Sequence, residues 1–169
     1  STLFPYTTLF RSLQNPEVKE YLLESIHGWI RDFDIDGIRL DCADCLDFGF
    51  MEELRRRTGE WKQDFWLMGE VIHGDYPRIV EESTMDSVTQ YELWKSIQHA
   101  LETENFFELD WNLKRHNSFL DSFVPQTFIG NHDVTRIASQ IGSAKAALAV
   151  AVLLTVGGVP SIYYGDEQG

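Results

Sequence analysis

The sequence has few cysteines, no long apolar run and few basic residues, and each shortage excludes a class of protein. Cys42 and Cys45 are the only cysteines among 169 residues, too few for a disulfide framework. The longest apolar stretch, around residues 146–156, is far shorter than the roughly 20 residues that span a bilayer, and it predicts a buried helix. Lysine and arginine total 14 against 27 acidic residues, and the net charge of −13 would repel nucleic acids and anionic membranes. We therefore expect neither as a partner.

The remaining composition is that of a globular domain with an unusual start. With 43% hydrophobic and 13% aromatic residues, the chain can bury a core, and its length indicates one domain. Residues 1–12 lack any periodicity and resemble the translation of a sequencing-library adapter, so we expect a non-native leader there and the native domain at residues 13–169. The alternative is a genuine aromatic-rich strand. On the first interpretation the natural N-terminus is missing and the compartment is unknown, with the cytoplasm favoured over secretion.

Helical and strand-like patterns alternate from residue 13 onward. Apolar residues at helical spacing predict helices at about 16–33, 48–54, 76–82, 93–101, 106–123 and 144–156. Short apolar runs predict strands at 35–41, 65–71, 87–91, 127–131 and 159–164. This alternation indicates βαβ units and a parallel sheet.

Acidic residues follow these strands at regular distances. Asp41, Glu70, Asp133 and Asp166 are separated by 29, 63 and 33 positions. A (β/α)8 barrel of about 250 residues repeats roughly every 31 residues and carries its active site at the carboxyl ends of its strands. Asp41 and Glu70 are therefore one repeat apart, Glu70 and Asp133 are two repeats apart, and Asp133 and Asp166 are again one repeat apart. Five strands do not close a barrel, so the fold is either a small open α/β sheet or a barrel whose first strands are missing.

The strand at 35–41 carries charge on one face. Because side chains alternate along a strand, Arg39 and Asp41 point one way and Ile38 and Leu40 the other. A neighbouring arginine favours the ionised form of a carboxylate, which a nucleophile needs. The alternative is a structural Arg39–Asp41 pair on an edge strand.

The other strand-end acids allow similar pairs of interpretations. Glu70 follows the apolar residues 65–68, surroundings that suit a proton donor, although a strand-end glutamate can also turn toward solvent. His132 and Asp133 could bind substrate hydroxyls and stabilise a developing cation, or Asp133 could cap the following helix. The Cys42–Cys45 pair has neither the helical context of a redox site nor two further zinc ligands, so we expect thiols that are buried or line the site.

Four motifs in succession carry a family resemblance. GIRLD, MGE, GNHD and GVPSIYYGDE, read from residue 37 to residue 167, resemble the strand-end motifs of the α-amylase family of glycoside hydrolases, glycoside hydrolase family 13, over residues 13–169. The resemblance implies an α/β fold that is part of a (β/α)8 TIM barrel, roughly its fourth to eighth strands. It implies these roles: Asp41 as nucleophile, Glu70 as general acid/base, Asp133 as transition-state stabiliser, and Arg39, His132 and Arg136 in substrate binding. Arg136 could instead neutralise the acidic cluster.

The resemblance also implies a function. We expect a retaining glycosidase that acts on α-linked glucans or oligosaccharides; the alternatives are a glucosyl transferase or isomerase of the same family, or a non-catalytic transport subunit. Asp44 and Cys45 stand where many members carry Lys-His, which favours short oligosaccharides or a neopullulanase-like branch. No cofactor is required for the chemistry, a structural calcium cannot be assigned to residues, and the oligomeric state is unknown. We expect residues 1–169 alone to be inactive, because their sheet would have unpaired edges.

Overall fold

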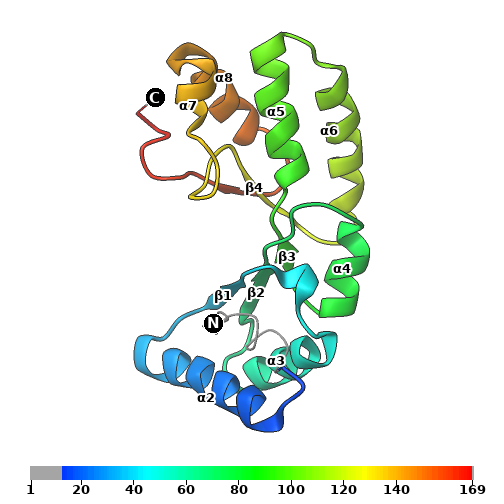
Figure 1. Ribbon diagram of the computed structural model, residues 1–169, viewed down its shortest axis with the longest axis vertical. Helices are drawn as coiled ribbons and strands as arrows, with labels where there is room; N and C mark the ends of the chain where they lie inside the picture. Colours follow the sequence, from blue (N-terminus) through cyan, green and yellow to red (C-terminus); the bar gives the residue numbers. More distant parts are fainter. Residues whose placement is uncertain (1–12, 169) are drawn as a thin grey trace, which may run out of the picture. The chain divides into compact units, whose positions relative to one another are not determined.

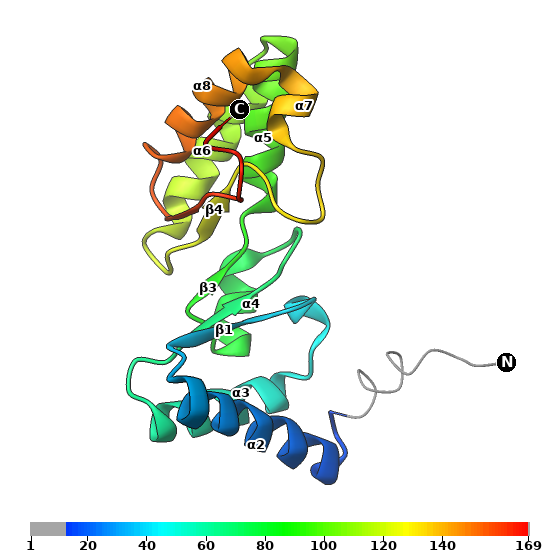
Figure 2. The ribbon, with the colours of Figure 1, turned by 90° about the vertical axis from the view of Figure 1, so that its left-hand side faces the viewer.

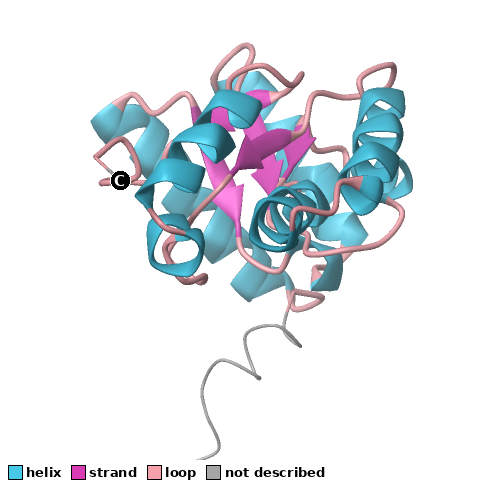
Figure 3. Cartoon of the chain, turned by 90° about the horizontal axis from the view of Figure 1, so that it is seen from above, coloured by secondary structure: helices cyan, strands magenta, loops and turns pink. Residues whose placement is uncertain are grey.

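The computed structural model describes residues 13–168, which form two compact units. The described part of the first unit comprises residues 13–70 and 78–86, and that of the second comprises 71–77 and 87–168 (Figure 1). Helices make up most of the regular structure, and the strands are short (Figure 3). The expected leader at 1–12 lies outside the described residues. Within residues 13–168, no helix combines the length and apolar character needed to cross a membrane.

The first unit is built on one pair of parallel strands. Its elements are α2 (Pro16–Phe33), β1 (Gly37–Leu40), the 3-10 turn η1 (Ala43–Cys45), α3 (Phe48–Trp61), β2 (Trp66–Gly69) and most of α4 (Tyr76–Ser83). β1 and β2 pair in parallel from Gly37 opposite Trp66 to Leu40 opposite Gly69. Helices α2 and α3 lie side by side next to this strand pair (Figures 1 and 2). The parallel pairing confirms the prediction from the sequence.

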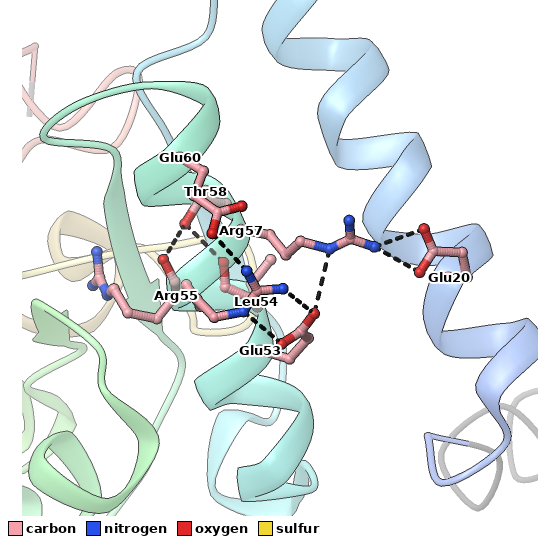
Figure 4. Close-up of polar contacts among 8 residues, drawn as sticks. Glu20, Glu53, Leu54, Arg55, Arg57, Thr58 and Glu60 are labelled. Carbon is pink, nitrogen blue, oxygen red and sulfur yellow. Dashed lines mark hydrogen bonds and ion pairs between the residues drawn. The ribbon is translucent and has the colours of Figure 1, made fainter.

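Apolar packing and helix caps explain why α2 and α3 form where they do. The side chain of Asn15 accepts from the Glu17 N–H at 2.9 Å, and Asp47 accepts from the Phe50 N–H at 2.8 Å, so each helix begins at a capped residue. The two helices bury the apolar residues Leu23, Ile26, Ile30, Phe50, Met51 and Leu54. Arg57 of α3 also binds Glu20 of α2 at 2.6 Å (Figure 4). An exposed ion pair contributes at most about 1 kcal/mol, so most of the stabilisation of this helix pair comes from the burial of its apolar side chains.

The charge alternation predicted for β1 is reflected in its surroundings. Arg39 is exposed, whereas Ile38 and Leu40 are half-buried. These two aliphatic side chains line an apolar cavity of about 490 Å³ together with residues of α2 that include Ile26 and Trp29; Arg39 and Asp41 also reach its lining. The aliphatic side chains of β1 and residues of α2 therefore line the same cavity.

Arg55 binds both the residue before β2 and the segment at 84–86. Arg55 of α3 donates to the carbonyl oxygens of Phe65, at 3.0 Å, and Thr84, at 2.8 Å, and to the Asp86 carboxylate at 2.6 Å. The same Asp86 oxygen accepts from the Leu67 N–H at 2.7 Å. Phe65 directly precedes β2, so this contact lies at the amino end of that strand.

The second unit carries three short parallel strands and four helices among its described residues. These elements are β3 (Ser87–Val88), α5 (Tyr91–Thr103), α6 (Phe107–Phe119), β4 (Gln126–Phe128), α7 (Ile137–Ile141), α8 (Ser143–Leu153) and β5 (Val159–Ser161). β4 and β5 pair in parallel, and a parallel bridge joins Thr89, just after β3, to Gln126 of β4. The buried core residues are Leu93, Ile97, Ala100, Leu101, Leu109, Ile129, Ile137, Ala146, Ala149 and Leu153.

A buried histidine links α6 to the turn before β5. His116 is fully buried, and its Nε2–H donates to the Gly157 carbonyl oxygen at 2.6 Å. Burial lowers the pKa of His116, because desolvation disfavours the charged ring. The folded state therefore favours the neutral imidazole over the charged one.

Some predicted boundaries were wrong for local reasons. The expected strand at 87–91 has only two residues, because the Gln90 side chain accepts from the Leu93 N–H and Tyr91 opens α5 instead. The helix expected at 106–123 ends at Phe119. The five-residue helix α7 was not predicted, since it is too short to show a helical repeat.

Candidate active site

Asp41 and Glu70 come together because their strands are neighbours in register. Each residue directly follows its strand, and the last residues of those strands, Leu40 and Gly69, lie opposite each other. One carboxylate oxygen of Asp41, one of Glu70 and the Cys42 sulfur all lie within 4.8 Å of one another. A separation of 29 residues in sequence thus becomes a pair of adjacent carboxylates.

Glu70 is buried and held by named donors. Only 7% of the surface of Glu70 is exposed to solvent. Arg39 Nη2 donates to Glu70 Oε1 at 2.7 Å, and the Cys42 N–H donates to Glu70 Oε2 at 3.3 Å. On the backbone, the Glu70 N–H donates to the Leu40 carbonyl at 2.8 Å, and the Ala43 N–H donates to the Glu70 carbonyl at 2.9 Å. Both the side chain and the backbone of Glu70 are therefore fixed.

Arg39 has a partner that the sequence interpretation did not include. Alternation along the strand suggested that Arg39 serves Asp41, and the structure shows a 2.7 Å contact from Arg39 to Glu70 on the neighbouring strand. The buried position of Glu70 excludes the solvent-facing alternative. Glu70 is therefore buried against a guanidinium and beside a second carboxylate.

A tight turn after Asp41 brings backbone donors to Glu70. Cys42 has a left-handed backbone, with φ 45° and ψ 49°, which costs a non-glycine residue roughly 1–2 kcal/mol. The turn places the fully buried Ala43 against Gly69, where an added Cβ would lie 2.7 Å from the Ala43 Cβ. Glycine at position 69 therefore permits the close approach on which the donors to Glu70 depend.

One of the two thiols lies beside the carboxylate pair. Cys42 and Cys45 are free and exposed, so neither is buried, and Cys42 lines the carboxylate pair, which was the other expected arrangement. Partial burial and the Asp41 carboxylate raise the pKa of the Cys42 thiol above its ordinary value. Asp41, Cys42 and Glu70 offer three metal-ligating atoms in the described chain, one fewer than the four of a structural zinc site.

In the second unit, His132 and Asp133 lie in the segment that follows β4. Their side chains are 58% and 52% exposed, and His132 Nε2 lies 3.1 Å from Asp133 Oδ2. The Asn131 side chain accepts from the Asp133 N–H at 2.9 Å and donates to the Tyr91 hydroxyl at 2.8 Å. The alternative that Asp133 caps the next helix was wrong, because α7 begins at Ile137 and its cap position is Arg136.

Arg136 is engaged with the end of the chain. Its Nη1 donates to the Tyr164 carbonyl at 2.6 Å and lies 3.6 Å from Asp166 Oδ1. The guanidinium lies over the rings of Tyr163 and Tyr164, at 5.1 and 4.5 Å from their centres. Burial raises the pKa of Asp166, and Arg136 opposes that shift. The predicted role of neutralising an acid is thus present, and substrate contact by Arg136 stays a prediction.

The structure groups the predicted residues by unit. Asp41, Glu70 and Arg39 meet in the first unit. His132, Asp133 and Arg136 share one segment of the second unit. Sequence reasoning missed Tyr91 as an anchor of Asn131, and nothing in the sequence marks that contact. It counted Asp166 only as a strand-end acid, although its position in the final motif could have suggested a partner for Arg136.

Comparisons with known proteins agree on one family. The family model described as the alpha amylase catalytic domain matches residues 11–169. The chain is 36% identical to a maltogenic alpha-amylase of Bacillus acidopullulyticus, and 34% identical to a cyclomaltodextrinase of Geobacillus thermopakistaniensis. Both alignments cover 92% of this chain, but they cover only 28% of the maltogenic alpha-amylase and 27% of the cyclomaltodextrinase. This chain therefore spans little more than a quarter of the length of these relatives. An alpha-amylase structure from Geobacillus thermoleovorans, in complex with acarbose, superposes with a TM-score of 0.82 at 30% identity, over 92% of this chain and 37% of that one.

Proposed function

Because this chain belongs to the family of alpha-amylase catalytic domains, we propose that the protein containing it is a retaining glycosidase acting on α-linked glucans or oligosaccharides. One observation carries the mechanism. Oxygens of Asp41 and Glu70 lie within 4.8 Å of each other. Retaining glycosidases hold their two carboxyl groups about 5–5.5 Å apart, whereas inverting enzymes separate them by about 6.5–9.5 Å to admit a water. The pair therefore fits direct attack by a carboxylate.

In the proposed mechanism, Asp41 is the nucleophile and Glu70 the general acid/base. The Asp41 carboxylate attacks the anomeric carbon while protonated Glu70 gives its proton to the leaving oxygen, which forms a covalent glycosyl-enzyme. Negative charge then develops on Glu70, where Arg39 Nη2 and the Cys42 N–H already point. Donors aimed at developing charge lower the barrier without reorganisation. In the second step, the Glu70 carboxylate takes a proton from a water whose oxygen attacks the anomeric carbon, and the bond from that carbon to Asp41 breaks, which releases the sugar and the Asp41 carboxylate.

His132 and Asp133 take the proposed role of binding sugar hydroxyls and stabilising the oxocarbenium-like transition state. Their exposure leaves both side chains accessible to a ligand. We assign β1 to β5 to the fourth to eighth strands of the (β/α)8 barrel. Their parallel pairing and the acids that follow them support this assignment.

The substrate we propose is a short α-linked oligosaccharide. The names of the relatives, a maltogenic alpha-amylase and a cyclomaltodextrinase, support an α-glucan substrate. Asp44 and Cys45 are exposed in η1, directly beyond Asp41 and Cys42, where they replace the Lys-His of many family members. The chemistry proposed here needs no cofactor, and we assign no residue to calcium.

Transfer to a sugar instead of water is the second candidate. A cyclomaltodextrin glucanotransferase of Geobacillus stearothermophilus is 32% identical over 92% of this chain. Both reactions share the glycosyl-enzyme, so the ratio of hydrolysis to transfer products from maltotriose separates them.

The test uses the full-length protein and isosteric variants. We expect Asp41→Asn to abolish turnover of every aryl α-maltoside. Glu70→Gln should lose about 10²- to 10⁴-fold with poor leaving groups and much less with 2,4-dinitrophenolate, which leaves without protonation. Glu52→Gln, which changes an exposed carboxyl of α3, is the matched control and should retain normal turnover. Near-normal activity of Asp41→Asn would refute the proposed role.

A further inference from the structure

The segment from Gly130 to Arg136 contacts residues beyond β5 at both of its ends. We propose that Arg136 and Asp166 are positioning residues that hold the His132–Asp133 turn in the geometry that binds the sugar. The catalytic readout of this proposal rests on the proposed function, whereas its structural readout does not.

Arg136 fastens the far end of the turn. Its guanidinium donates to the Tyr164 carbonyl at 2.6 Å and lies over the Tyr163 and Tyr164 rings. The Tyr164 contact is with the backbone beyond β5, so Arg136 connects the segment after β4 to the segment after β5. Gly165 has φ 89°, and an added Cβ there would lie 3.0 Å from Arg136 Nη1. The guanidinium thus fits closely against this backbone.

Asp166 packs against the near end of the turn. Its side chain is 2% exposed, and within the described chain its Oδ2 atom has no hydrogen-bond partner. That oxygen lies against Gly130, where an added Cβ would come within 2.8 Å of it. Since Gly130 directly precedes Asn131, the carboxylate packs on the backbone at which the turn begins. A buried charge of this kind is tolerated when a partner is near, and Arg136 is 3.6 Å away.

A second contact fixes the interior of the turn independently. The Asn131 amide donates to the Tyr91 hydroxyl, and the Asn131 carbonyl oxygen accepts from the Asp133 N–H. His132 and Asp133 themselves are more than half exposed, so burial does not orient them. Their direction depends on these backbone anchors. Because catalysis tolerates little misplacement, a shift of about 1 Å can cost roughly 100-fold in rate.

Four variants of the full-length protein separate positioning from stability. Arg136→Met removes the carbonyl contact and leaves Asp166 buried without its arginine, so we expect a lower Tm and a kcat reduced about 10- to 100-fold. Adding Asp166→Asn removes the uncompensated charge and should restore much of the Tm while kcat stays low. Arg136→Lys keeps the charge and should recover part of kcat. Arg55→Met removes an arginine with similar partners at a strand's amino end and should lower Tm without lowering kcat.

Hydrogen exchange supplies a readout that needs no turnover. Peptides covering residues 129–136 should exchange at least about 10-fold faster in Arg136→Met than in the wild type, and at the wild-type rate in Arg55→Met. A kcat that recovers together with Tm in the double variant would overturn the proposal, as would unchanged exchange of this segment. If the wild-type protein turns over no α-glucoside, the proposed function fails, and the exchange result alone decides the positioning role.

Discussion

Gly69 is the position at which a single methyl group should disturb the carboxylate pair most directly. In Gly69→Ala, the new Cβ would lie 2.6 Å from Met85 Cε and 2.7 Å from Ala43 Cβ. Met85 is flexible enough to move aside. Ala43 is fully buried and belongs to the turn that donates to Glu70, so relief on that side displaces the donors.

The expected magnitude follows from these contacts. Overpacking a filled core costs about 1–3 kcal/mol, and weakening the Ala43 N–H bond to the Glu70 carbonyl adds roughly 0.5–1.5 kcal/mol. Gly69→Ala should therefore lower the free energy of unfolding by about 2–4 kcal/mol. It should also reduce kcat, because the Cys42 N–H moves away from Glu70 Oε2.

A matched glycine in the same unit provides the control. Gly59 lies inside α3, and a Cβ added there meets no atom within 4 Å, so Gly59→Ala should stabilise the protein by about 1 kcal/mol. Urea unfolding of the full-length variants, followed by the signal of the catalytic domain, measures both changes. Equal stability of the two variants, or full kcat in Gly69→Ala, would refute this reasoning.

Other consequences of the site can be measured in the same protein. Because burial lowers the pKa of His116, the unfolded chain binds a proton near pH 6.5 that the folded chain rejects, so stability is lost as pH falls below about 6.5. Between pH 7.5 and 5.5 this loss amounts to at most about 1.4 kcal/mol relative to His116→Gln, and identical pH profiles would contradict it. Alkylation of Cys42 should abolish activity. The rate of alkylation should keep rising up to an unusually high pH, because burial and neighbouring acids raise the pKa of the Cys42 thiol. A Cys42→Ser variant that is inactivated equally fast would exclude Cys42 as the site of reaction. Arg39→Met should lower kcat by roughly 10²- to 10³-fold for poor leaving groups and less for activated ones, and an equal loss for both would mean that Arg39 does not assist Glu70.

The sequence predicted which acidic residue follows each strand, because that depends only on the residues of that strand. The positions of Asp41 and Glu70 after apolar runs, one barrel repeat apart, were enough to pair them. The 2.7 Å contact from Arg39 to Glu70 depends on the register between two strands, which alternation along one strand does not specify. Alternation along one strand therefore could not predict the Arg39–Glu70 contact.

Short local interactions limited the rest of the prediction. The Gln90 side chain converts the end of an expected strand into the start of α5. The Asn131 side chain accepts from the Asp133 N–H in a turn that comes before α7, so Asp133 lies too early in the chain to cap that helix. Such contacts are worth about 1 kcal/mol each and leave no periodic pattern. The positioning contacts of Arg136 join residues nearly 30 positions apart, so only the fold shows them.

The central claim is that Asp41 forms a covalent bond to the sugar. Incubating the full-length protein with a 5-fluoro-α-glucosyl fluoride, followed by peptide mass spectrometry, tests it most directly, because the fluorine slows release of the intermediate more than its formation. We predict one added glycosyl group on the peptide that contains Asp41, absent in Asp41→Asn, and the α-anomer as the first product of normal turnover. A label on a different residue, or the β-anomer as first product, would contradict the account.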